Sequence, residues 1–353
     1  MSGDDNRQER GRHNAGPTSF GWEFQTIASI ALMLDTLKDN VLINVEGEYE
    51  DAEITKTDGR IVYIQAKSST KPTLQKDSSK KASYDSEAKG KLKKALDTFK
   101  EHVPEFEKKG KNFQFIYVCN MQYPLGADGG RAWSGFDKYY EDELTEDERE
   151  FLNSAGYDQQ LGRIRFCTFE MHPAEDYATS KKTALTEVEK FLTKLDIPGG
   201  YSERYLKEMT ALCWNTEADQ SFTLKKEHFI ANAIQMKLQF DQQEYNNEFG
   251  DYGIPAEIIE ERFSAIVNQL TQRYECLTKV LAEFASYETE RAYLERKAKF
   301  ISYYASNFID EHLKTIDSEY QECLAKYIIS VIINRGQYIK KANKEFMRND
   351  YNK

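Results

Sequence analysis

The chain has 353 residues, which is enough for about two domains of the usual size, and 40% of its residues are hydrophobic. With 30% charged residues and only 7 Pro and 19 Gly, the composition is typical of a soluble globular protein and excludes a collagen-like or low-complexity chain. Acidic residues outnumber basic ones by 59 to 48, so the net charge of −11 argues against a protein whose whole surface binds nucleic acid.

Apolar runs and cysteines exclude further classes. The runs 27–34 and 327–333 are far shorter than the roughly 18 residues of a membrane-spanning helix. Residues 1–16 contain no apolar secretion signal and are predicted to be disordered, so we expect a cytoplasmic protein without membrane contact. The five cysteines are an odd number and widely spaced, and most lie in apolar segments, which predicts buried thiols rather than disulfides or a zinc site.

The first predicted element is a helix that follows Pro17 and runs to about Leu37. Apolar residues recur in it at helical spacing: Phe24, Ile27, Ala28, Ala31 and Leu32. Three short segments with strand-like patterns follow at 41–45, 51–55 and 61–67, with a turn signal at Asp58-Gly59 between the last two. They predict a three-stranded meander.

A crossover unit is predicted next. The polar stretch from Ser68 to Ser83 predicts a mobile loop, and the spacing of apolar residues predicts a helix from about Ser86 to His102. The apolar segment Phe113–Cys119 predicts a buried strand. In this order, the fourth strand can return beside the third through a helical crossover.

The second half of the chain is predicted to be helical. A strand at 162–170 and a helix at 183–195 extend the α/β unit, and Ile197-Pro198-Gly199-Gly200 predicts a boundary. Helical patterns then dominate, at 202–215, 224–241 and in a run from 256 to 349 that only Gly336 interrupts. The expected domains are therefore an α/β domain at 17–200 and an elongated helical bundle or helical hairpin at 201–353.

Acids and a Gln-x-Lys sequence surround the second and third predicted strands. Gln65 and Lys67 are two residues apart in a strand and project to one side, next to acids of the preceding strand, including Glu50 and Asp51. Acids and an amide oxygen are ligands for a hard divalent cation such as Mg2+. With Lys67 orienting or deprotonating a water, this combination predicts hydrolysis of a phosphodiester.

At these residues the chain resembles the PD-(D/E)xK nuclease superfamily, in its Mrr-like branch with Gln-x-Lys. The similar segments are Gly21-Trp22-Glu23-Phe24-Gln25, Glu50-Asp51, Ile64-Gln65-Ala66-Lys67 and a helix that ends at Lys94–Phe99. More closely, the chain resembles the double-stranded DNA endonuclease domain of CBASS effector nucleases and of the effector subunit of Lamassu anti-phage systems. The resemblance covers about residues 17–200 and implies an α/β fold with a restriction-endonuclease-like core, followed here by a mostly α-helical C-terminal domain.

The resemblance also implies an activity, which is largely sequence-nonspecific cutting of double-stranded DNA with Mg2+ or Mn2+. It implies Asp51 and Gln65 as metal ligands, Lys67 as the catalytic lysine, and Glu23 or Gln25 as groups that approach from the first helix. For Lamassu it further implies an SMC-like ATPase and a small accessory subunit that hold the nuclease inactive until it is triggered and self-assembles as a homo-oligomer. No nucleotide-sensing domain is recognisable after residue 200, which favours Lamassu over CBASS.

The turn between the second and third strands decides which acid faces the site. A tight two-residue turn at Asp58-Gly59 would set Asp51 opposite Ala66 and Glu50 opposite Lys67, which turns Asp51 away. Asp51 as a ligand therefore requires a wider turn or a bulge. Otherwise the working acid is Glu50.

Lysines are concentrated between Lys67 and Lys111, where 13 of them face only seven acidic residues. After the catalytic strand, such a segment can neutralise phosphates along a duplex. The predicted DNA contacts are Lys71, Lys76, Lys80, Lys81 and Lys91. A solvated helix face is the alternative for the lysines, and a non-catalytic scaffold that binds DNA or protein is the alternative for the whole chain.

Overall fold

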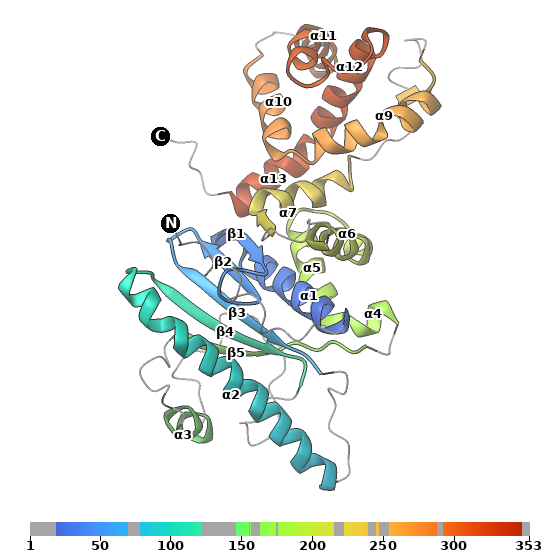
Figure 1. Cartoon of the computed structure of the whole chain (residues 1–353). Coiled ribbons are helices and arrows are strands. Elements are labelled where there is room, and N and C mark those ends of the chain that lie inside the picture. Colours follow the sequence, from blue (N-terminus) through green and yellow to red (C-terminus); the bar gives the residue numbers. More distant parts are fainter. Residues whose placement is uncertain are drawn as a thin grey trace, which may run out of the picture. The chain divides into compact units, whose positions relative to one another are not determined.

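The computed structural model of the chain describes residues 19–69, 78–121, 146–154, 156, 163–173, 176–214, 222–238, 245–246, 254–287 and 292–347. They form two compact units (Figure 1). The first contains the described residues up to Val188 together with Leu206–Thr223, and the second contains Glu189–Tyr205 and the described residues from Leu224 onward. The single boundary expected between residues 200 and 201 stays a prediction, and residues 1–16 lie outside the described part of the chain.

A six-stranded mixed sheet with the order β5-β4-β3-β2-β1-β6 organises the first unit. Its strands are β1 (Asn40–Val45), β2 (Ala52–Lys56), β3 (Ile61–Lys67), β4 (Phe113–Cys119), β5 (Ile164–Thr168) and β6 (Phe222–Lys225). β1, β2 and β3 pair antiparallel, whereas β3, β4 and β5 pair parallel. The expected meander and helical crossover are therefore present. The four-residue strand β6 was not predicted, because so short a segment carries no clear alternation.

The helices of this part of the chain are α1 (Ser19–Asp35), the 3-10 turn η1 (Leu37–Asp39), α2 (Ser78–Lys108), α3 (Glu146–Ser154), α4 (Tyr177–Ser180) and α5 (Lys182–Lys194). α2 begins eight residues before the predicted start at Ser86, so the loop prediction is wrong over 78–83. α2 also continues through Pro104 to Lys108, beyond the predicted end at His102. Val103 and Phe106 in this extension are apolar and buried, so packing stabilises it.

The two faces of the sheet bury different helices. Residues of α2 share one hydrophobic core with residues at alternate positions of β3 and β4, among them Tyr63, Phe113 and Phe115. Because successive side chains of a strand point to opposite faces, the buried residues between these positions face the other side. α1 contacts β1, β2 and β3 and buries 11 of its 17 residues. Figure 1 shows α2 running along the sheet.

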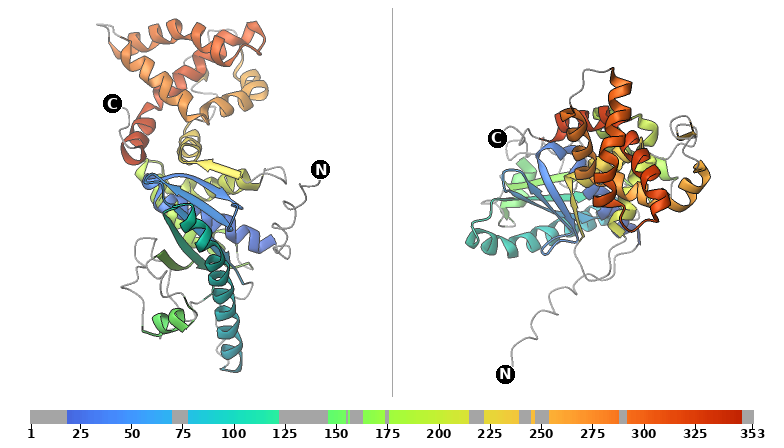
Figure 2. Two further views of the ribbon diagram at one scale, coloured as in Figure 1. Left: turned by 60° about the vertical axis from the view of Figure 1, so that its left-hand side comes forward. Right: turned by 90° about the horizontal axis from the view of Figure 1, so that it is seen from above.

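The second unit is helical, as expected. Its helices are α7 (Lys226–Gln235), α9 (Ala256–Thr271), α10 (Tyr274–Ser286), α11 (Tyr293–His312), α12 (Ser318–Asn334) and α13 (Gly336–Phe346) (Figures 1 and 2). The turn η5 (Gly199–Tyr201) and the first residues of α6 (Ser202–Trp214) also belong to this unit. The described residues of the predicted run from 256 to 349 thus form five separate helices. Every residue from Cys323 to Ile333 of α12 is buried, which makes this apolar run part of the core.

Two expectations about composition can be compared with the described residues. All five cysteines are free and buried, which confirms the interpretation as buried thiols. No helix in the described ranges is long and apolar enough to cross a membrane.

Candidate functional site

The turn between β2 and β3 is wider than a tight two-residue turn. The Lys56 amide donates to the Arg60 carbonyl at 2.8 Å and the Gly59 amide donates to the Lys56 carbonyl at 3.1 Å, so three residues make the connection. Gly59 has φ 83°, a left-handed conformation that glycine adopts at little cost. In the resulting register Ala52 pairs with Ile64, whereas a two-residue turn would have paired Ala52 with Gln65. The wider turn that the Asp51 assignment requires is therefore present.

Continuing this register by one residue brings Asp51 opposite Gln65, and donors converge on its carboxylate. Asp51 Oδ2 accepts hydrogen bonds from Gln65 Nε2 at 2.6 Å and from the Ala66 amide at 2.7 Å, and Lys67 Nζ lies 3.5 Å from the same oxygen. Strand alternation places Gln65 and Lys67 on the same face. The acid, the amide and the lysine predicted from sequence are thus brought together at one oxygen.

Gln25 approaches this acid from α1, but through the backbone. Its Nε2 donates to the carbonyl oxygen of Asp51 at 2.8 Å, and the Glu46 amide donates to the same carbonyl at 2.8 Å. The side chain of Gln25 therefore holds the main chain at Asp51 in place. Because this contact is with the backbone carbonyl and not with the carboxylate, Gln25 supports the site from behind.

Glu50 is buried and lacks a hydrogen-bond partner for one oxygen. Its Oε1 is inaccessible and accepts no hydrogen bond from the residues that the structure describes. Burial, together with the negative charge of Asp51, raises the pKa of Glu50 to about 9, although the charge of Lys67 opposes the shift. An unsatisfied carboxyl oxygen beside a second carboxylate is an environment that a bound cation would improve, because the cation would supply the missing partner.

Glu23 is not brought to this group. It precedes Gln25 by two positions, which is about 200° around an α-helix, so the two side chains leave α1 on nearly opposite sides. The Glu23 carboxylate instead pairs with Lys181 Nζ at 3.0 Å. The resemblance implied that Glu23 or Gln25 approaches the site. In the structure Gln25 does so, whereas the helical period turns Glu23 toward Lys181.

The donor set fits a hard cation better than zinc. Two carboxyl groups, of Glu50 and Asp51, and the amide of Gln65 provide oxygen atoms of the kind that Mg2+ and Mn2+ bind. In the structure the Gln65 amide donates a hydrogen bond to Asp51 through Nε2, so the amide must rotate before its oxygen can serve as a ligand. No group of three or more His, Cys, Asp or Glu that could hold a metal occurs among the described residues, so an amide oxygen would have to complete the set.

The predicted DNA-contacting lysines have different outcomes. Lys71 and Lys76 lie outside the described residues, and of Lys80 and Lys81 only the backbone, in α2, is described. Lys91 Nζ donates to the carbonyl of Ser68 at 2.8 Å and also pairs with Glu87 at 2.9 Å. Lys91 therefore ties the chain that leaves β3 to α2, which is a structural contact that the sequence did not indicate.

Asn120 is a buried residue of this region that directly follows β4 and that the sequence analysis did not single out. Its side chain accepts from the Ser69 amide at 2.7 Å and donates to the carbonyls of Ser69 at 2.8 Å and Met171 at 3.0 Å. Since Lys67 pairs with Cys119 in the parallel ladder, these bonds fix the chain just beyond Lys67. The available signal was a polar residue directly after a continuous apolar strand.

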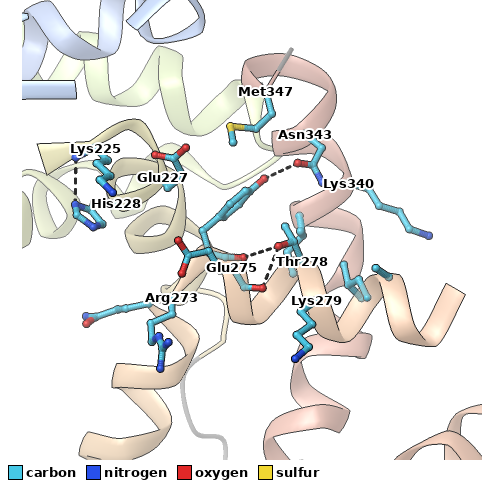
Figure 3. A pocket seen from close by; sticks show the side chains of 15 residues that line it. Lys225, Glu227, His228, Arg273, Glu275, Thr278, Lys279, Lys340, Asn343 and Met347 are labelled. Carbon is cyan, nitrogen blue, oxygen red and sulfur yellow. Dashed lines mark hydrogen bonds between the residues drawn. The ribbon is translucent and has the colours of Figure 1, made fainter. Parts of the chain in front are cut away.

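A separate cavity of about 1050 Å³ lies within the second unit, between α7, α10 and α13 (Figure 3). Its polar residues contact one another: the Lys225 amide donates to His228 Nδ1 at 3.2 Å, and the Tyr274 hydroxyl donates to Asn343 Oδ1 at 2.8 Å. Burial lowers the pKa of His228. Among the residues that line this cavity, these contacts are structural and no nucleophile is paired with a base, so the group around Asp51 remains the better candidate.

Comparison with known proteins adds no relative. No family model, no curated protein and no solved structure matches this chain. The candidate site therefore has to be judged by its own geometry, which joins two carboxyl groups, an amide and a lysine where β2 begins and β3 ends.

Proposed function

We propose that the first unit is a metal-dependent endonuclease that hydrolyses phosphodiester bonds of double-stranded DNA with little dependence on base sequence. The convergence of Gln65 and Lys67 on Asp51 Oδ2 is the observation that supports it most. A second supporting observation is the buried Oε1 of Glu50, next to Asp51 in the chain, which accepts no hydrogen bond from any residue that the structure describes. Both belong to a β-meander, crossover helix and parallel strand in the order that the PD-(D/E)xK resemblance implies.

In this proposal the side chains have distinct tasks. Asp51, Glu50 and a rotated Gln65 hold Mg2+ or Mn2+ through oxygen atoms. When bound, such a cation supplies positive charge that stabilises the negative charge developing on the phosphate. Lys67, an ammonium group next to Asp51, donates hydrogen bonds that orient a water or the phosphate, and its ion pair with Asp51 keeps it in place.

The biological setting is a further part of the proposal and rests on the resemblance of residues 17–200. The protein would act as the effector of a Lamassu-like anti-phage system, inactive in a complex with an SMC-like ATPase and a small accessory subunit and active after self-assembly. The second unit, which consists of helices, would provide the docking surfaces. A CBASS-type effector is the alternative within the same activity.

Plasmid cleavage tests the activity. The full chain, both dilute and concentrated enough to self-assemble, is incubated with supercoiled plasmid in Mg2+, in Mn2+ and in EDTA. We expect nicking and linearisation with the metals only, and a loss of at least about 100-fold in Lys67→Ala, because the ammonium group contributes directly to the transition state. Lys314→Ala, an exposed lysine of the second unit, is the matched control and should cut like the wild type.

Two results would contradict the proposal. One is cleavage by Lys67→Ala at the wild-type rate, which would assign the activity to something other than this site. The other is a wild-type chain that binds duplex DNA but never cuts it at any concentration, with or without its partners. That second result would favour the non-catalytic scaffold.

A further inference from the structure

The loop between β1 and β2, residues 46–51, carries both carboxyl groups of the candidate site. It leaves β1 through Glu46, whose φ of 56° is left-handed, and the Glu46 amide closes the loop by donating to the Asp51 carbonyl at 2.8 Å. The Trp22 Nε1 of α1 donates to Glu46 Oε1 at 2.6 Å. One end of the loop is therefore held from α1.

The other side of the loop is held by an aromatic side chain that points toward α2. The Tyr49 ring lies edge-on to Tyr63 of β3, with ring centroids 6.0 Å apart, and edge-on to His102 and Phe106 of α2 at 5.1 and 5.0 Å. Edge-to-face pairs at such distances are favourable beyond the area that they bury. Tyr49 thus inserts between the sheet and the last turns of α2.

The polar end of Tyr49 is also bound. Its hydroxyl donates to Glu105 Oε1 at 2.8 Å and accepts a hydrogen bond from Lys109 Nζ at 3.1 Å. The ammonium group of Lys111 lies 5.1 Å from the centroid of the ring, at the distance of a cation–π contact. The ring and the hydroxyl therefore anchor the loop to the same part of α2 by independent contacts.

The backbone around Tyr49 is fixed as well. The Tyr49 amide donates to Glu53 Oε1 at 3.0 Å, so the first residues of β2 fold back on the loop. A Cβ added to Gly47 would lie 2.5 to 2.7 Å from the side chain of Glu53, which means that the loop approaches this carboxylate as closely as only glycine allows.

The anchors also supply order that the carboxyl groups do not provide for themselves. The buried Oε1 of Glu50 accepts no hydrogen bond from the described residues, so this oxygen is not held by a partner of its own. A loop without anchors would leave the relative positions of the Glu50 and Asp51 carboxyl groups less restricted. A cation site, however, needs its oxygen ligands together before the ion arrives, since ordering them later costs affinity.

We propose that Tyr49 is a positioning residue for the cation site, because its ring fixes residues 46–51 against α2 and keeps the carboxyl groups of Glu50 and Asp51 close enough to share one divalent ion. The inference rests on the proposed function for the role of the ion. The anchoring of the loop can be measured without it.

The experiment compares Tyr49→Ala and Tyr49→Phe with a control, Phe99→Leu, in the full chain. Phe99 belongs to the same aromatic core and stacks on Phe115 at 4.2 Å, and its ring pairs do not include Tyr49. Mn2+ binding is measured by calorimetry, and hydrogen exchange of the amides of 46–51 is measured without metal. Both are recorded well below the melting temperature of each variant.

For Tyr49→Ala we expect Mn2+ to bind about 10-fold more weakly and the loop amides to exchange at least about 10-fold faster, because the carboxyl groups are no longer preorganised. Tyr49→Phe keeps the ring and should stay within about threefold of the wild type in both. Phe99→Leu should lower the melting temperature and leave both readouts unchanged. Excess Mg2+ should restore cleavage by Tyr49→Ala, whereas it should not restore cleavage by Lys67→Ala.

Each contrary result has a separate meaning. Loop exchange in Tyr49→Ala at the wild-type rate, in a protein whose wild type binds Mn2+, overturns the positioning role and leaves the proposed function standing. Equal effects of Tyr49→Ala and Phe99→Leu also overturn it, since they reduce Tyr49 to a core residue. A wild type that binds no Mn2+ overturns both the proposed function and the role of Tyr49 toward a cation.

Discussion

At the scale of single residues, two adjacent carboxyl groups differ because their partners differ. Asp51 accepts two hydrogen bonds through one oxygen and pairs with Lys67, whereas Glu50 is buried with an oxygen that accepts none from the described residues. Sequence spacing identified both acids, but it could not show which of them is buried and which is hydrogen-bonded. Burial and hydrogen bonding depend on how the loop packs against β3, whose Gln65 and Ala66 lie 14 and 15 residues further along the chain than Asp51.

The charge of Asp51 is expected to matter for catalysis far more than for folding. Asp51→Asn keeps an oxygen that can accept the hydrogen bond of the Ala66 amide, but it loses the ion pair with Lys67. The Lys67 side chain is partly exposed, so the loss of this ion pair costs little stability. We expect cleavage to fall at least about 100-fold, while the free energy of unfolding changes by less than about 1 kcal/mol. Urea unfolding beside plasmid cleavage checks this. A large loss of stability would mean that Asp51 is mainly structural.

His102, which lies against Tyr49 and Phe106, gives a pH dependence with a defined sign. Burial lowers its pKa, against the opposing charges of Glu101 and Glu105, so the unfolded chain binds more protons than the folded chain near pH 6. The free energy of unfolding should therefore fall as the pH drops below about 6.5, the ordinary value for histidine.

The substitution His102→Gln should remove that part of the decline. Unfolding by urea at pH 8 and pH 5 measures it, as the difference between the wild type and the variant at each pH. A difference that is the same at both pH values would show that His102 does not contribute to the pH dependence.

At the scale of elements, one turn decides which residues meet. The segment around Asp58-Gly59 was compatible with a two-residue turn, which would have put Asp51 on the wrong face. The structure uses three residues, with Gly59 left-handed, and so shifts the register by one position. A one-residue shift reverses the face of every side chain in a strand, which is why composition could not settle the choice.

Two glycines should respond oppositely to alanine. Gly59→Ala places a Cβ on a residue with φ 83° and should cost about 1 kcal/mol. Gly90→Ala lies in α2, where an added Cβ meets nothing within 4 Å, and should stabilise by about 0.5–1 kcal/mol, since alanine favours helix. Urea unfolding of both variants compares the two free energies. Shifts of the same sign would contradict the role of Gly59 in the turn.

Helix boundaries show where local patterns lose information. The residues between α9, α10, α11 and α12 are not proline, and the break before α13 adjoins Gly336 as the pattern indicated. The long run at 256–349 therefore reads as continuous helix, although its described residues form five helices. Such turns are set by which helices pack together, and the surrounding propensities are too similar to reveal them.

At the scale of the whole molecule, the acidic excess belongs to a different part than the chain order suggests. By position along the chain, residues 111–353 hold 30 basic and 40 acidic residues and so carry most of the net charge. Counted by unit, the second unit has 21 basic and 23 acidic residues and is almost neutral. The excess lies in the first unit, where 111–188 and 206–223 hold nine basic and 17 acidic residues.

This distribution predicts where charge limits DNA binding. The short helix α3 carries exposed Glu146 and Glu150 and belongs to the same unit as the lysine-bearing α2. Glu146→Gln with Glu150→Gln should raise the affinity for duplex DNA roughly two- to threefold at low salt, because less negative charge then faces the phosphates. The control pair Glu257→Gln and Glu283→Gln, in the second unit, should have no effect. Fluorescence anisotropy measures both, and equal changes would contradict the assignment.

The order of elements from α1 to β4, their apolar faces and the group of Asp51, Gln65 and Lys67 were determined by the sequence itself, because alternation and helical spacing are local properties of a chain. The tertiary structure decided the rest. Register brought Asp51 to Gln65, the helical period turned Glu23 toward Lys181, and contacts with α2 made Tyr49 an anchor. These outcomes depend on pairs of residues far apart in the chain, whose distances no local pattern contains.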